Sequence, residues 1–194
     1  MDFKQAKEFI LAKQAKELPA HLTYHNIAHI QDVYAAAGRH IAAVGIKDDA
    51  AILLQTAALF HDSGFIEQAA GHEEISCNFA KQYLPGFGYS DDHIAVICGM
   101  IRATKIPQQP QTPLEEILAD ADLDYLGRND FWEISDKLFA ELKHTGVVDS
   151  EESWNQMQVR FFESHHYFTA YAKAYRETKK QENLQRIKNK LITL

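Results

Sequence analysis

Apolar residues recur every three or four positions through most of the chain, which is the spacing of one face of an α-helix. A first such run ends before Pro19, and a second covers residues 26–44. The apolar face of the second run consists of Ile30, Val33, Tyr34, Ala37 and Ile41. Residues 50–60, AAILLQTAALF, are apolar nearly all round and follow Asp48 and Asp49, either of which could cap a helix. This third run therefore predicts a buried central helix.

Helical patterns continue through the rest of the chain, with a proline-rich loop at residues 105–113. The predicted helices cover residues 72–84, 91–104, 114–126, 131–143 and 153–190, with a break allowed in the last. No stretch shows the sustained period-two alternation of a half-buried strand. We therefore predict an all-α fold, and a length of 194 residues is most simply one domain.

Composition and charge narrow the class of protein. An apolar content of 46% with 24% charged residues is ordinary for a globular chain. A formal charge of −7 without a basic stripe argues against nucleic acid as the main partner. Cys77 and Cys98 are too few for a disulfide framework, no signal-peptide pattern opens the chain, and no apolar run approaches the ~20 residues of a membrane span. These features predict a cytoplasmic protein with two buried thiols and no membrane partner.

Candidate chemistry begins in the stretch YHNIAHI, residues 24–30. Asn26 is a residue type that caps helices, which leaves His25 just outside the helix and puts His29 in its first turn. His61 and Asp62 follow at the end of the apolar run, before Gly64. Alone, this pair could simply cap the helix end. Asp122 favours a different interpretation. With His29, His61 and Asp62 it gives two imidazoles and two carboxylates, a set of ligands that suits a divalent cation.

The order H…HD…D, read here as YHNIAHIQDV, LFHDSGF and LADADLDYLGR, resembles the signature of the HD superfamily of metal-dependent phosphohydrolases. The resemblance spans residues 22–128, includes GHEEIS at residues 71–76, and leaves residues 129–194 as a helical extension. It implies an HD-domain helical bundle within a single domain, 1–194, and a bound divalent metal ion (Mn, Mg, Zn, Fe, Co or Ni). The implied ligands are His29, His61, Asp62 and Asp122, with Asp62 also orienting the attacking water.

The YHNxxH form of the first motif is similar to that of class I cyclic nucleotide phosphodiesterases. In that group the second histidine binds metal and the first donates a proton to the leaving oxygen. Carried over by position, this implies that His29 is a ligand and His25 a general acid.

Three aspartates compete for the last ligand position. The family pattern assigns the ligand to Asp122, which directly precedes Leu123. Residues two apart on a helix face different ways, so Asp120 is expected to point elsewhere and to support the ligands indirectly. Asp124 is expected to be solvated or salt-bridged.

Substrate contacts are expected from a further set of residues. His72 matches an additional ligand position of two-metal members, but Ala103 stands where the second extra histidine would be, so one metal is expected and His72 is assigned to phosphate or bridging water. Lys105 and Arg128 are cationic side chains next to the motifs and could bind phosphate. Gln158, Phe161 and His165 are expected on one helical face, where a purine could stack. For Lys105 and Arg128 a surface salt bridge is an equal alternative. For Gln158, Phe161 and His165 the alternative is a helix that merely covers the core.

Together these patterns predict a metal-dependent phosphohydrolase, a phosphomonoesterase or phosphodiesterase. Its substrate is expected to be a small phosphate ester: a nucleotide, a cyclic nucleotide or a related phosphorylated metabolite. One alternative is a non-catalytic metal-bearing HD module that binds or senses a nucleotide. Another is a structural helical protein with incidental His and Asp residues. A homodimer is left open.

Overall fold

The computed structural model describes residues 1–193, and within that range every regular element is helical. The α-helices are α1 Phe3–Glu17, α2 Ile27–Val44, α3 Asp48–Phe60, α4 His72–Tyr83, α5 Asp91–Ala103, α6 Pro113–Asp122, α7 Phe131–His144, α8 Glu151–Ser164 and α9 Ala170–Thr193. Three short 3₁₀ turns join them: η1 Ser63–Ile66, η2 Leu84–Phe87 and η3 Asp124–Gly127. The all-α prediction is confirmed. No helix of this range is long and apolar enough to cross a membrane.

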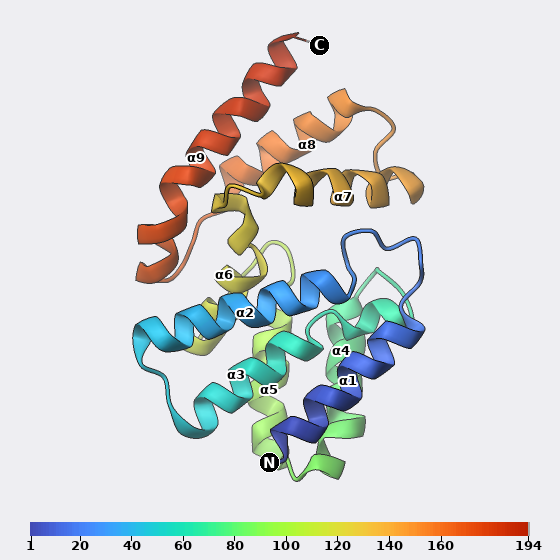
Figure 1. The fold of residues 1–194 in the computed structure, drawn as a ribbon, viewed down its shortest axis with the longest axis vertical. Helices are drawn as coiled ribbons and strands as arrows, with labels where there is room; N and C mark the ends of the chain where they lie inside the picture. Colours follow the sequence, from blue (N-terminus) through green and yellow to red (C-terminus); the bar gives the residue numbers. More distant parts are fainter. Residues whose placement is uncertain (194) are drawn as a thin grey trace.

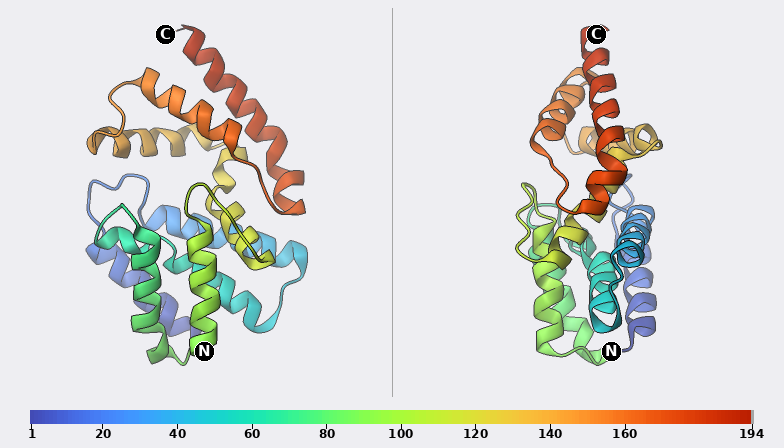
Figure 2. Two further views of the ribbon diagram at one scale, coloured as in Figure 1. Left: turned by 180° about the vertical axis from the view of Figure 1, so that it is seen from behind. Right: turned by 90° about the vertical axis from the view of Figure 1, so that its left-hand side faces the viewer.

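The helices form two layers (Figure 1). Helices α1 to α6 make a bundle around one apolar core, with α3 at its centre as its apolar run predicts. Helices α7 to α9 form a second layer across one end of that bundle, and Figure 2 shows both layers from behind and from the side. A separate apolar cluster joins the second layer to η3 and to Tyr24.

The start of α2 follows the predicted capping pattern. The Asn26 side chain accepts a hydrogen bond from Ala28 N at 2.9 Å and donates to the Thr23 carbonyl at 2.8 Å. These bonds end the preceding loop and begin the helix at Ile27. His25 consequently lies outside α2 and His29 in its first turn, as predicted.

Two helix boundaries differ from the sequence expectation. The N-cap of α3 is Lys47, and no side chain forms a capping hydrogen bond there. Asp48 and Asp49 lie in the first turn, where their negative charges interact favourably with the helix dipole. The run predicted as one helix over residues 114–126 instead breaks after Asp122, and η3 follows. Gly127 allows this turn to meet α9 closely, because a Cβ there would lie 2.3 Å from the Arg176 carbonyl oxygen.

Asp124 joins the two layers. Its carboxylate is 2% exposed and accepts from Arg39 of α2 at 2.7 Å and from Arg176 of α9 at 2.7 Å. Arg128 adds a longer contact of 3.4 Å and also pairs with Asp32 and Asp130. The expectation of a salt-bridged Asp124 is confirmed, but this carboxylate is buried rather than solvated.

Neighbouring Asp120 fixes the start of α9. It is fully buried and accepts from Phe168 N at 2.9 Å, and from Thr169 N and Oγ1 at 2.8 and 2.7 Å. Burial raises the pKa of this carboxyl group, although the hydrogen bonds oppose the rise. Asp120 therefore points away from the other two aspartates, as the sequence predicted.

We expect Asp124→Asn to lower the free energy of unfolding by about 3 kcal/mol, because it leaves a group of arginines without their shared buried counter-charge. Asp130→Asn is the matched control: it also pairs with Arg128, but its side chain is 46% exposed, so the loss should stay below about 1 kcal/mol. Urea denaturation followed by circular dichroism measures both. Equal losses in the two variants would contradict the assigned role of Asp124.

Candidate metal centre and cavity

Four side chains from three helix ends meet between the layers. His29 comes from the first turn of α2, His61 and Asp62 follow α3, and Asp122 ends α6. The two imidazole Nε2 atoms lie 3.4 Å apart. Asp62 Oδ2 lies 3.3 and 3.2 Å from the His29 and His61 Nε2 atoms, and Asp122 Oδ1 lies 3.2 and 3.4 Å from the same atoms. The four predicted ligands are thus brought together, and Asp122 is the one of the three aspartates that contacts both imidazoles.

The orientation of His61 favours metal binding. Its Nδ1 donates to the Ala58 carbonyl at 2.9 Å, which leaves the Nε2 lone pair directed at the cluster. The ring is fully buried, and the His29 side chain is nearly so. A metal ligand histidine commonly has this backbone partner on its other nitrogen.

The two carboxylates of the cluster favour positive charge at the imidazoles. Burial disfavours ionisation of every member, but the contacts within the cluster outweigh it. The pKa of His29 is raised to about 9 by Asp122 and Asp62, and that of His61 is raised well above its usual value. The same contacts lower the pKa of Asp122 to about 2 and that of Asp62 well below its usual range.

The surroundings of Asp62 Oδ2 test whether these donor atoms fit a divalent cation. It is buried within ion-pair distance of both imidazoles, yet it accepts no well-aligned hydrogen bond. Ligand atoms about 3 Å apart suit a cation with metal–ligand distances of about 2.0–2.2 Å. The atoms offered by His29, His61 and Asp122 all lie within 4.8 Å of one another. The donor set therefore fits a divalent cation.

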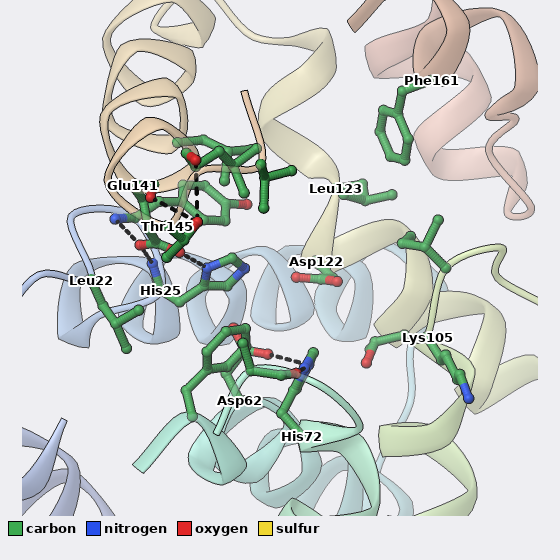
Figure 3. A pocket seen from close by; sticks show the side chains of 18 of the residues that line it. Leu22, His25, Asp62, His72, Lys105, Asp122, Leu123, Glu141, Thr145 and Phe161 are labelled. Atoms are coloured by element: carbon green, nitrogen blue, oxygen red, sulfur yellow. Dashed lines mark hydrogen bonds and ion pairs between the residues drawn. The ribbon is translucent and has the colours of Figure 1, made fainter. Parts of the chain in front are cut away.

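His72 extends the cluster on the side of the cavity. Its Nε2 lies 3.3 Å from Asp62 Oδ1, and its Nδ1 donates to the Ala69 carbonyl at 3.0 Å (Figure 3). Burial opposes its charged form, but Asp62 outweighs burial and raises the pKa of His72. Gly64 makes this approach possible, because a Cβ there would lie 2.1 Å from the His72 carbonyl oxygen. His72 is thus held beside the metal ligands.

His25 lies near the cluster but outside it. Its ring stacks on Phe65 with centroids 4.1 Å apart and lies 6.0 Å from the ring of His29. Its Nδ1 forms a short hydrogen bond with Glu141 Oε1, while Glu141 Oε2 accepts from the backbone amides of Tyr24 and His25 at 2.8 and 3.0 Å (Figure 3). His25 is therefore fixed by a carboxylate from the second layer.

Sequence reasoning missed Glu141. The available signal is its position on α7: it lies three residues after Leu138 and ten after Phe131, on the face that packs against the bundle. A glutamate in an apolar helical stripe calls for a partner, because burying an unpaired carboxylate is costly. The sequence alone did not identify that partner as His25.

A cavity of about 680 Å³ opens from the cluster into the space between the layers. Asp62, Asp122, His25 and His72 line one end of it. Of the predicted substrate contacts, Lys105, Gln158 and Phe161 also line it. Figure 3 shows Lys105 and Phe161 on the side of the cavity opposite His25 and Glu141.

Two predicted substrate contacts lie elsewhere. The cavity lining does not include Arg128, whose guanidinium is engaged by aspartates of the layer junction. His165 was expected on one helical face with Gln158 and Phe161, but α8 ends at Ser164 and His165 adopts an extended backbone. Burial and nearby Lys180 lower the pKa of His165 to about 3, so it is neutral at pH 7 and offers no cation to a phosphate.

Comparison with known proteins supports the fold assignment. No family model matches the chain, and no curated protein matches it. The crystal structure of a predicted HD superfamily hydrolase from an uncultured Thermotogales bacterium is similar, with a TM-score of 0.64 and 19% sequence identity. The similarity covers 98% of this chain and 91% of that one, so it includes the second layer. The chain has the HD-domain fold, as its motifs predicted.

Metal content separates the roles of the two histidines of the first motif. We expect His29→Ala and Asp62→Ala to lose bound metal after loading and desalting, because each removes a ligand from the cluster. His25→Ala should retain metal at the wild-type ratio. Elemental analysis of folded protein, checked by circular dichroism, measures this. Equal metal loss in His25→Ala would make His25 a ligand instead.

Proposed function

We propose that this protein is a metal-dependent phosphohydrolase that cleaves a small phosphate ester, of a nucleotide, a cyclic nucleotide or a related phosphorylated metabolite. One observation carries the proposal: the buried His29, His61, Asp62 and Asp122 set meets a cavity that also presents a carboxylate-held histidine.

The four ligands and the cation have separable tasks. A divalent cation held by this set would supply Lewis-acid polarisation of a phosphoryl oxygen and acidification of water. Asp62 serves as ligand through Oδ2, and its Oδ1, beside His72, orients the attacking water. His61 and His29 hold their Nε2 atoms toward the same point, with His61 locked by the Ala58 carbonyl.

His25 acts as the general acid in this proposal. Its Nδ1–H donates to Glu141, so in the imidazolium form the second proton, on Nε2, is the one that would pass to the leaving oxygen. The bond to the Glu141 carboxylate and the stacking on Phe65 fix the orientation of the ring. This arrangement gives the two histidines of YHNIAHI different tasks.

His72 and Lys105 face the charge that develops on the phosphoryl group. His72 is held beside Asp62, and its raised pKa favours a cationic imidazole. Lys105 contributes from the exposed rim of the cavity, where its flexible side chain can reach the phosphoryl oxygens.

The second candidate is a non-catalytic metal-bearing module that binds or senses a nucleotide. The observation that favours catalysis over this candidate is the His25–Glu141 pair, because a binding site has no need of a positioned proton donor. A sensor would bind metal and nucleotide without releasing product over hours.

We expect hydrolysis of at least one member of a panel of phosphate monoesters, nucleotides and cyclic nucleotides incubated with each of Mn²⁺, Mg²⁺, Co²⁺ and Zn²⁺. Asp62→Ala should lose at least about 100-fold in turnover, because it removes both a ligand and the group that orients water. The assay combines free phosphate detection with chromatography, since cleavage of a cyclic diester releases no free phosphate. Turnover that survives in metal-depleted Asp62→Ala would exclude this site.

The His25–Glu141 pair has a distinct kinetic signature. His25→Gln and Glu141→Gln should lower kcat about 100-fold for an alkyl phosphate, whose leaving oxygen needs a proton, and leave KM nearly unchanged. For 4-nitrophenyl phosphate, whose leaving group departs as an anion, the loss should be less than about fivefold. Equal losses for both substrates would mean that the pair only maintains the structure.

A further inference from the structure

The cavity has two chemically different ends. Near the metal cluster its lining is polar, whereas the wall supplied by η3 and the second layer is almost wholly apolar. That wall consists of Leu123, Leu126, Leu138, Leu142, Val147, Trp154, Met157, Phe161 and Phe162. A volume of about 680 Å³ is within the ordinary range of pockets that enclose an organic ligand. The apolar wall can therefore receive the part of a substrate that carries no phosphate.

Two polar side chains of this wall have intramolecular partners. The one hydroxyl proton of Thr145 is shared between the carbonyls of Glu141 and Leu142, which lie 3.2 and 3.1 Å from Oγ1. Gln158 Oε1 accepts from Ser135 at 2.8 Å, and its Nε2 donates to Asn155 at 3.1 Å. A sugar or base placed here would give up hydrogen bonds to water without replacing them, which costs free energy. The purine contact expected of Gln158 is therefore unfavourable.

Charge around the cavity limits the number of phosphates. Lys105 is the single Lys or Arg among the described lining residues. Five carboxylates line the same space, those of Asp62, Glu67, Glu73, Asp122 and Glu141. A di- or triphosphate needs several cationic donors for its extra charges. One phosphoryl group can be met by the cation that the four ligands would hold, together with His72 and Lys105.

We propose that the site selects a phosphate ester of an apolar alcohol: one phosphoryl group at the metal and an alkyl or aryl group against the wall of the second layer. This inference rests on the proposed function and narrows its substrate class away from nucleotides. The alcohol gains affinity by leaving water for the apolar wall, without any new hydrogen bond.

A homologous series tests this selectivity: methyl, butyl and hexyl phosphate, compared with AMP and ATP, each below its critical micelle concentration. We expect kcat/KM to rise about fourfold per buried methylene along the series. AMP and ATP should be poorer substrates than hexyl phosphate. A flat series, or a preference for either nucleotide, would overturn the inference while leaving phosphohydrolase activity established.

Substitutions in the apolar wall test whether the selectivity arises at this wall. Met157 and Leu142 line the cavity and are half-buried. Met157→Gln and Leu142→Gln should lower kcat/KM for hexyl phosphate about tenfold and leave methyl phosphate within about twofold, because the polar amide penalises only the long chain. Met157→Leu should retain the wild-type slope. Val44→Gln, at a 60% exposed position outside the cavity, controls for a general effect of the substitution.

A binding measurement separates this inference from the proposed function. Calorimetry of the Mn²⁺-loaded protein with methyl- and hexylphosphonate, which are not hydrolysed, should show tighter binding of the longer compound and loss of that difference in Met157→Gln. If this holds but no ester is turned over, the substrate class stands and the catalytic proposal fails. If the two phosphonates bind equally, the inference is wrong whatever the activity.

Discussion

Buried carboxylates must each find positive charge or donors, and this constraint organises the molecule around the segment ADADLD at residues 119–124. Its three aspartates point in three directions. Asp120 accepts hydrogen bonds at the start of α9, Asp122 joins the imidazoles of α2 and α3, and Asp124 pairs with arginines of both layers. The break between α6 and η3 makes these directions possible. One short segment thus positions the second layer and completes the candidate metal centre.

The second layer contributes chemistry as well as a cover. α7 supplies Glu141, which fixes His25, and α7 and α8 supply most of the apolar wall of the cavity. The bundle of α1 to α6 supplies the metal ligands. The proposed proton donor is therefore positioned across the layer junction. This dependence explains why a carboxylate such as Asp124, outside the cavity lining, matters to the shape of the site.

Local signals in the sequence predicted the helices, because capping and apolar periodicity depend on short-range chemistry, whereas the residues that meet at the candidate metal centre were found through the family resemblance of the motif order. Asn26 caps its own helix, the apolar run before His61 has to be buried, and the motif order selects Asp122. Such local signals do not predict which side chains pair across long distances in the sequence. Glu141 lies 116 residues from His25, and no motif near either residue predicts the contact. The same limit explains Arg128, whose partners include the distant Asp32. The ring of His165 does stack on Phe161 as its spacing predicted, but it packs against Tyr167 instead of lining the cavity.

The central claim is that one divalent cation binds between His29, His61, Asp62 and Asp122, at the polar end of the cavity. Anomalous diffraction from crystals loaded with Mn²⁺ and hexylphosphonate tests it directly. The account predicts a manganese peak within bonding distance of both Nε2 atoms and both carboxylates, with the phosphonate on the metal and the hexyl chain against the wall of the second layer. A peak at another site, or no peak among these four residues in metal-loaded crystals, would contradict it.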